Sequence, residues 1–62
     1  MQRVKNLHVE LIGSTVGEDF ADATINYDEN WLIVNYKDNE VYLTRLYPAS
    51  KIIVQFEKIW KK

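Results

Sequence analysis

Few residues in this sequence have types and spacings that could carry chemistry. The single histidine, His8, alternates with the apolar Leu7 and Val9, so a strand here would hold the imidazole on the face opposite to theirs. A histidine that acts as a general base needs a nucleophile or an orienting acid within reach, and no serine or aspartate has a recognisable spacing to it. We therefore expect a structural role for His8 and a chain that is not an enzyme.

Two further segments have part of the pattern of a ligand site. The stretch Gly13-Ser14-Thr15-Val16-Gly17 has two glycines, but it lacks the Gly-Lys-Ser/Thr ending of a phosphate-binding loop and a following helical pattern. Glu18, Asp19 and Asp22 could offer oxygen ligands to Ca²⁺ or Mg²⁺, but the Asp-x-Asp-x-Asp-Gly loop with its closing glutamate is missing. We expect an ordinary loop, a solvated acidic rim, no metal and no cofactor.

Length and composition narrow the class of protein. The chain has 62 residues, 47% of them hydrophobic, which predicts one domain over 1–62 and is too apolar for a disordered segment. It has no cysteine, which excludes disulfides and thiolate metal sites and fits a reducing, cytoplasmic setting. No run approaches the roughly 18 apolar residues of a membrane span.

Charge is segregated along the sequence although the total is small. The net charge is −1, which gives no global electrostatic argument for binding nucleic acid. Residues 18–40 hold seven acids against one lysine, whereas residues 41–62 hold five bases against one acid. Strands that fold back on one another can mix these segments, so the sequence leaves open whether two charged poles exist in space.

The elements that would position these residues are strands, because apolar and polar residues alternate along most of the chain. The alternation predicts an all-β fold: a small five-stranded antiparallel barrel or a strongly bent sheet. A loop over 13–19 separates the first two strands. The last strand begins with the β-branched Ile52-Ile53-Val54, and its Lys-rich end is left as either frayed or helical. The predicted strands cover 3–12, 21–27, 31–36, 41–47 and 51–57.

Two short turns predict a register for the middle three strands. A two-residue loop at Glu29-Asn30 places Tyr27 opposite Leu32, and one at Asp38-Asn39 places Tyr36 opposite Val41. Both choices gather apolar residues on one face, and a one-residue slip in either hairpin would scatter them. The predicted core is Leu7, Val9, Leu11, Ala23, Ile25, Tyr27, Leu32, Val34, Tyr36, Val41, Leu43, Ile52, Val54 and Phe56.

The segment Tyr47-Pro48-Ala49-Ser50-Lys51-Ile52 resembles the short helical step before the final strand of the Src-homology-3-like barrels. The resemblance covers these residues alone and implies the layout of that fold, with a longer first loop, a three-strand meander and a tight step into the last strand. The signalling members carry an N-terminal aromatic motif that forms half of their proline-peptide groove, and Leu7-His8-Val9-Glu10 does not supply it. No binding residue is therefore carried over from the family.

The second face of the meander carries the most informative side chains. It is predicted to show Trp31, Ile33, Tyr42 and Leu46. This apolar set is either covered by the rest of a small barrel or left exposed as a contact surface. We predict that an exposed set binds a protein partner or a second copy of the chain, which would form a homodimer. The expected function is a small non-catalytic interaction or regulatory module, working through this set or through the acidic flank.

Two other kinds of partner are alternatives. A small barrel can combine basic residues with stacking rings to bind nucleic acid, and the C-terminal segment offers both. Conversely, the acids of 18–40 could imitate a nucleic-acid backbone and occupy a basic protein. Very small, cysteine-free, single-domain proteins are common among regulatory or phage-derived inhibitors. The alternative nucleic-acid-binding residues are Arg45, Lys51, Lys58, Trp60, Lys61 and Lys62.

Overall fold

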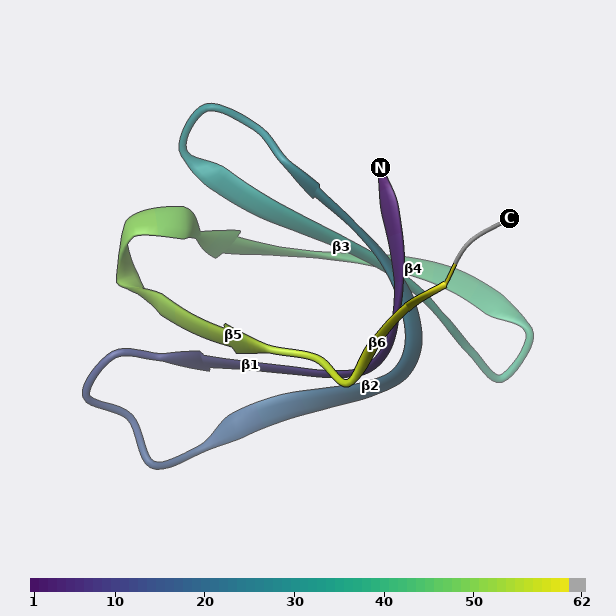
Figure 1. Cartoon of the computed structure of the whole chain (residues 1–62), viewed down its shortest axis with the longest axis horizontal. Helices are drawn as coiled ribbons and strands as arrows, with labels where there is room; N and C mark the ends of the chain where they lie inside the picture. Colours follow the sequence, from purple (N-terminus) through teal and green to yellow (C-terminus); the bar gives the residue numbers. More distant parts are fainter. Residues whose placement is uncertain (61–62) are drawn as a thin grey trace.

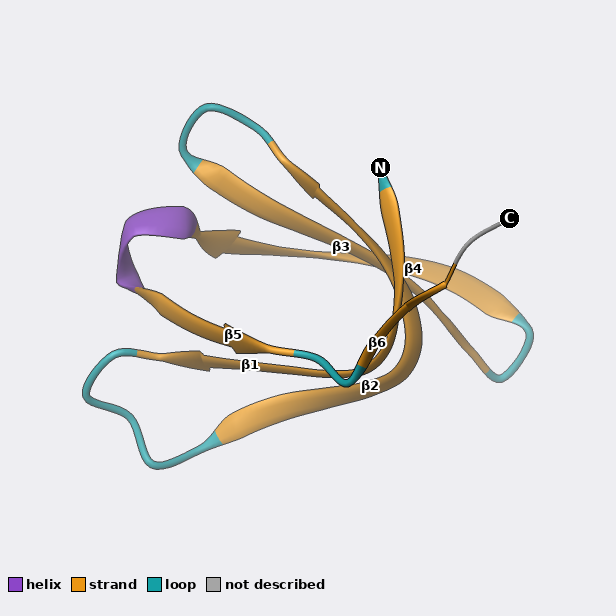
Figure 2. Ribbon diagram, viewed as in Figure 1, coloured by secondary structure: helices purple, strands orange, loops and turns teal. Residues whose placement is uncertain are grey.

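The computed structural model describes residues 1–60, with side chains over residues 1–59, and these residues form one antiparallel sheet (Figures 1 and 2). Neighbouring strands follow the order β4-β3-β2-β1-β5, and β6 also pairs with β1. Over this range β4 and β5 stay at the two edges, so the sheet bends without closing into a barrel. The all-β prediction is confirmed in its bent-sheet form. The elements are β1 (Gln2–Leu11), β2 (Gly17–Tyr27), β3 (Trp31–Asp38), β4 (Val41–Pro48), the helical turn η1 (Ala49–Lys51), β5 (Ile52–Gln55) and β6 (Lys58–Trp60).

The last predicted strand is two strands. Both β5 and β6 pair with β1 in one register, and the backbone between them bends at Glu57. The Glu57 N–H donates to the Lys5 carbonyl oxygen at 3.0 Å, which holds the bend against β1. The prediction of one strand over 51–57 is therefore wrong at its end, and the segment is extended rather than helical from Lys58 to Trp60.

A crease crosses the sheet where β1, β2 and the β5–β6 segment all bend (Figure 1). Inward-facing residues of a regular strand lie two apart. Here β1 buries Val4 and Leu7, three apart, and β2 buries Phe20 and Ala23, also three apart. These four residues stay paired, Val4 with Ala23 and Leu7 with Phe20. Both strands therefore exchange their faces together at the crease, which folds two halves of one sheet around a common core.

Asn6 lies at the crease and takes a left-handed backbone conformation, with a φ of 54°. Asparagine is one of the few residues with a side chain that adopts this conformation readily. Its Nδ2 amide donates to the Glu57 carboxylate at 2.7 Å. The residue that bends β1 therefore also ties the bend of the β5–β6 segment to it.

Substitutions of Asn6 can separate the backbone requirement from the hydrogen bond. Both Asn6→Ala and Asn6→Gly lose the bond to Glu57, but only alanine has a Cβ that opposes a positive φ. We expect Asn6→Ala to have a free energy of unfolding about 1 kcal/mol lower than Asn6→Gly, measured by urea denaturation. Equal stabilities would show that Asn6 does not need the left-handed conformation.

The register of the first predicted hairpin is confirmed, and that of the second is wrong by two residues. β2 pairs with β3 as predicted. In the β3–β4 hairpin Tyr36 lies opposite Leu43 instead of Val41, because the turn is Asn39-Glu40 and not Asp38-Asn39. A shift of two residues keeps each side chain on its predicted face, since side chains alternate with period two.

The backbone of this turn is strained at its second residue. Asn39 and Glu40 have φ angles of 49° and 68°, as in a type I′ turn, whose twist matches that of the strands and whose preferred sequence is Asn-Gly. Glutamate, unlike glycine, has a Cβ that opposes a positive φ, so Glu40 is strained at the second position.

We expect Glu40→Gly to raise the free energy of unfolding by about 1 kcal/mol, because glycine takes a positive φ without strain. The substitution also removes an exposed ion pair with Lys37 at 3.0 Å, which contributes little. Glu40→Ala is the matched control, since it removes the same ion pair but keeps a Cβ, and it should bring no gain. A Glu40→Gly variant less stable than the wild type in urea denaturation would contradict the turn geometry.

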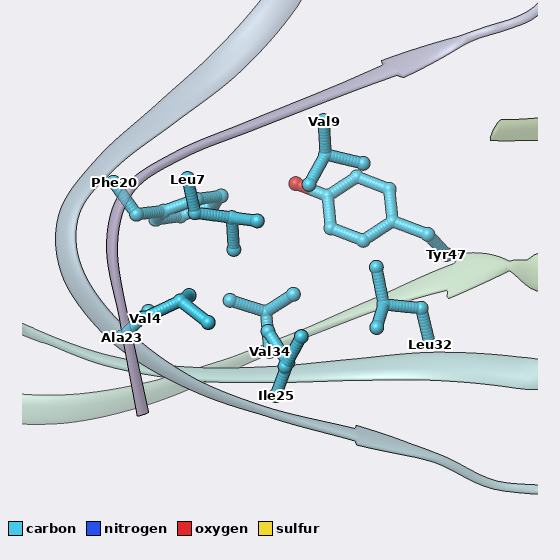
Figure 3. Close-up of a cluster of buried hydrophobic side chains, with 9 residues drawn as sticks. All are labelled: Val4, Leu7, Val9, Phe20, Ala23, Ile25, Leu32, Val34 and Tyr47. Carbon is cyan, nitrogen blue, oxygen red and sulfur yellow. The ribbon is translucent and has the colours of Figure 1, made fainter. Parts of the chain in front are cut away.

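The core lies inside the bend, and Figure 3 shows its side chains converging from β1, β2, β3 and β4. Most of the predicted core is confirmed, either as buried residues or as partly buried residues packed against them. The exceptions lie at strand ends or on the open edges of the sheet, where no neighbouring strand covers them. The confirmed residues are Leu7, Val9, Ala23, Ile25, Leu32 and Val34, with Tyr36, Ile52 and Val54 partly buried; the exposed ones are Leu11, Tyr27, Val41, Leu43 and Phe56.

The core also contains Val4, Phe20 and Tyr47, which the sequence pattern did not predict. Val4 lies beyond the crease, where the alternation of β1 has reversed. Phe20 was missed because β2 begins at Gly17, inside the predicted loop. Burial, with a smaller contribution from the Glu18 carboxylate, raises the pKa of Tyr47 to about 12, and its hydroxyl points toward Val9 in Figure 3.

Candidate functional site

The outer face of the β3–β4 hairpin carries contiguous apolar side chains that remain accessible. Leu32 and Val34 point into the core, so alternation turns Trp31 and Ile33 outward. Leu46 lies opposite Ile33 on β4. Trp31 is 45% exposed and Leu46 is 58% exposed, whereas Ile33 between them is half-buried. We call Trp31, Ile33 and Leu46 the outer patch.

Tyr42, the fourth residue of the predicted set, lies on the same face but apart from the outer patch. The polar pair of Asn35 and Thr44 separates them, joined by a 2.8 Å hydrogen bond from Thr44 Oγ1 to Asn35 Oδ1. Tyr42 is 79% exposed, and the Lys37 Nζ lies 5.4 Å from its ring centroid, within the range of a cation–π contact. The structure therefore brings three of the four predicted residues together and leaves Tyr42 across a polar row.

The acidic flank is less acidic in space than along the sequence. Arg3 donates to both carboxylate oxygens of Asp22, at 3.1 and 2.8 Å, and this guanidinium holds the pKa of Asp22 below its ordinary value. Glu18 forms an ion pair with Arg45 of β4. Folding therefore mixes charges that the sequence keeps apart, and the two predicted segments do not form separate poles at these positions.

His8 lies between two carboxylates. Its Nε2 is 2.9 Å from Glu10 Oε2, and its Nδ1 is 2.5 Å from Asp19 Oδ1. The carboxylates of Glu10 and Asp19 favour the imidazolium form and raise the pKa of His8. A Cβ at Gly17 would lie 2.4 Å from the ring, so glycine at this position leaves the space that the imidazole occupies. Both ring nitrogens are engaged, and the contact with Asp19 ties β1 to β2.

The sequence pattern missed the contact between His8 and Asp19 because the predicted loop ended at residue 19. In the structure β2 begins at Gly17, which places Asp19 directly opposite His8. Gly17 is the sequence signal that could have revealed this contact, because it has no side chain and lies beside the bulky side chains of His8 and Glu10.

An open cleft of about 450 Å³ lies where β2 and β3 separate. The rings of Phe20 and Tyr36 line it, with their centroids 4.7 Å apart. Much of the charge on its rim is already paired, with Arg3, His8 and Arg45, so the cleft offers a charged ligand few free groups. The charged residues of the rim are Glu18, Asp19, Asp22, Lys37 and Asp38.

The described members of the alternative nucleic-acid set lie on different parts of the molecule. Arg45 shares the inner face of β4 with the buried Tyr47 and is engaged by Glu18. Lys51 lies beside Ile12, just past the end of β1, whereas Lys58 pairs with Lys5 near the middle of β1, on the other side of the crease. The side chain of Trp60 and the residues Lys61 and Lys62 lie outside the described part of the chain.

Comparisons with protein families, curated proteins and solved structures found no match to this chain. The Src-homology-3-like layout therefore stays a prediction, although η1 occupies the predicted helical step. Within residues 1–60, no helix is long and apolar enough to cross a membrane. The same residues bring together no group of three or more side chains able to hold a metal ion.

The pairing of His8 predicts a pH dependence of stability. A raised pKa in the folded state means that the stabilisation is complete below the unfolded histidine pKa, about 6.5, and is lost as pH rises through the folded value. We expect the free energy of unfolding of the wild type, relative to His8→Gln, to fall as pH increases above about 6.5. Urea denaturation across this range measures the difference. Parallel pH profiles for the two proteins would contradict the pairing.

Proposed function

We propose that this chain is a small non-catalytic interaction module that binds a polypeptide partner through the outer patch. The observation that carries the proposal is the contiguous, accessible surface of Trp31, Ile33 and Leu46 on one hairpin. Exposed apolar clusters are typical of interaction sites, and buried tryptophan is among the side chains that contribute most to binding energy. The cysteine-free sequence agrees with a cytoplasmic setting for this module.

The surroundings of the outer patch support a protein partner. Thr24, Asn35 and Thr44 form a polar row beside it, since Asn35 lies opposite both threonines on the neighbouring strands. Asn26 lies opposite Ile33 on the other side of β3. An apolar centre with uncharged hydrogen-bonding groups at its border is the usual anatomy of a protein interface. A partner segment with an exposed apolar side chain would fit against Trp31.

A nucleic-acid partner has less support from the arrangement of charges. Binding to a phosphate backbone requires several free cations along one surface. Arg45 already pairs with Glu18, and Lys51 and Lys58 lie apart on the two sides of the crease. The proposal is therefore confined to a polypeptide.

The proposal predicts that one tryptophan controls partner binding. Cross-linking in lysate of the source cells, with the chain immobilised, identifies a captured protein, whose affinity is then measured by titration calorimetry. Trp31→Ala should weaken binding by about tenfold or more, because it removes the largest side chain of the outer patch. Tyr27→Ala is the matched control, an exposed aromatic residue outside the patch. A partner that binds the wild type and Trp31→Ala equally well would refute the assigned surface.

A further inference from the structure

The free edge of β4 presents backbone groups that no other strand within residues 1–60 uses. The N–H and C=O of Trp31 both bond to Asp28, at 3.3 and 2.9 Å, so they do not bond to Pro48, which lies opposite Trp31 on β4. Bonded and non-bonded pairs alternate along antiparallel strands. Every second residue before Pro48 therefore turns its N–H and C=O toward the free edge: Leu46, Thr44 and Tyr42.

The two edges of the sheet differ in how well they are protected against pairing. Natural edges are protected by charges, prolines, bulges or short strands. β5 is four residues long, and Glu57 and Lys58 follow it at the bend. β4 is eight residues long, with six successive exposed residues, and its one charged side chain, Arg45, is paired with Glu18 on the inner side. Pro48 limits β4 only at its last position.

We propose that the β4 edge pairs with the β4 edge of a second copy of this chain, antiparallel about a twofold axis at Thr44. A hydrogen-bonded pair across the interface requires two residues whose backbone N–H and C=O face the free edge. This requirement leaves few possible registers. An axis at Arg45 would place two guanidinium groups directly opposite each other, which is unfavourable. With an axis at Leu43, the residues of β4 that follow Arg45 would lie opposite the partner's turn and would have no strand to pair with. The axis at Thr44 pairs nearly the whole strand and places Arg45 opposite the partner's Leu43.

This pairing deepens the proposed function and rests on it, because the joined surface is a binding site only if the outer patch is one. On the outer face Tyr42 lies opposite the partner's Leu46, and Thr44 lies opposite the partner's Thr44. Cross-strand pairs of these types stabilise a sheet. Tyr42, which a polar row separates from the outer patch of its own chain, thus extends the patch of the partner. The second copy supplies the aromatic residue that completes the site.

A single introduced cysteine tests the register, because the natural chain has none. Cα atoms of a bonded antiparallel pair lie about 5.5 Å apart, within the range of a disulfide. We expect mild oxidation to convert Thr44→Cys into a covalent dimer. Ile53→Cys, at a position 43% exposed on the opposite edge, is the matched control and should stay monomeric. Equal cross-linking of both variants, or none of Thr44→Cys, would overturn the proposal.

Sedimentation equilibrium tests the pairing without a cross-link. The wild type should be a dimer, and Thr44→Pro should be monomeric at the concentrations where the wild type is dimeric, because it removes an N–H that serves only the free edge. Far-UV circular dichroism checks that the variant folds; if it does not, the cysteine pair decides. A wild type that stays monomeric at millimolar concentration overturns the proposal. If the wild type is monomeric but Trp31→Ala abolishes partner binding, the proposed function is supported and only the dimer is rejected. The proposed function and the dimer can therefore fail separately.

Discussion

The bend at Asn6 is the constraint on which the rest of this structure depends. A chain of 62 residues buries only a modest fraction of its surface, and here one sheet folds onto itself to enclose the core. The left-handed backbone at Asn6 reverses the alternation of β1, and the bond from its side chain to Glu57 brings the β5–β6 segment into the same bend. Val4 and Leu7, on the two sides of the crease, can then face one core.

The bend also determines which surfaces of the sheet remain accessible. β1 pairs on one side with β2 and on the other with both β5 and β6, so both edges of β1 are used. The β3–β4 hairpin has its inner face against the core, and what remains of it is the outer patch and the free edge of β4. Folding also carries Arg3 and Arg45 to Asp22 and Glu18, which mixes part of the charge that the sequence keeps apart. These observations are why we propose the apolar face of the hairpin, rather than a charged surface, as the binding site.

Local alternation was enough to predict the all-β class, the β2–β3 register and most of the core, because period two is a property of each strand by itself. The errors share a different cause. Val4 became buried because the crease reverses the alternation, and one positive φ at an asparagine is not visible in a hydrophobic pattern. The observed β3–β4 register places the buried Tyr47 opposite Leu32, and this long-range packing is not visible in a local turn signal. Of the candidate site, Trp31, Ile33 and Leu46 came from strand parity, which survives a shift of two residues. The separation of Tyr42 depends on the exact register and could not be predicted.

The central claim is that one sheet is creased at Asn6 and stays open between β4 and β5. Cross-strand nuclear Overhauser contacts, filtered to those within one chain by mixing labelled and unlabelled protein, test it directly. The structure predicts contacts of Val9 with Val54 and of Val4 with Ile59, on the two sides of the crease. It predicts no backbone contacts between β4 and β5. A ladder of backbone contacts joining β4 to β5 would show a closed barrel with no free β4 edge and would contradict the account.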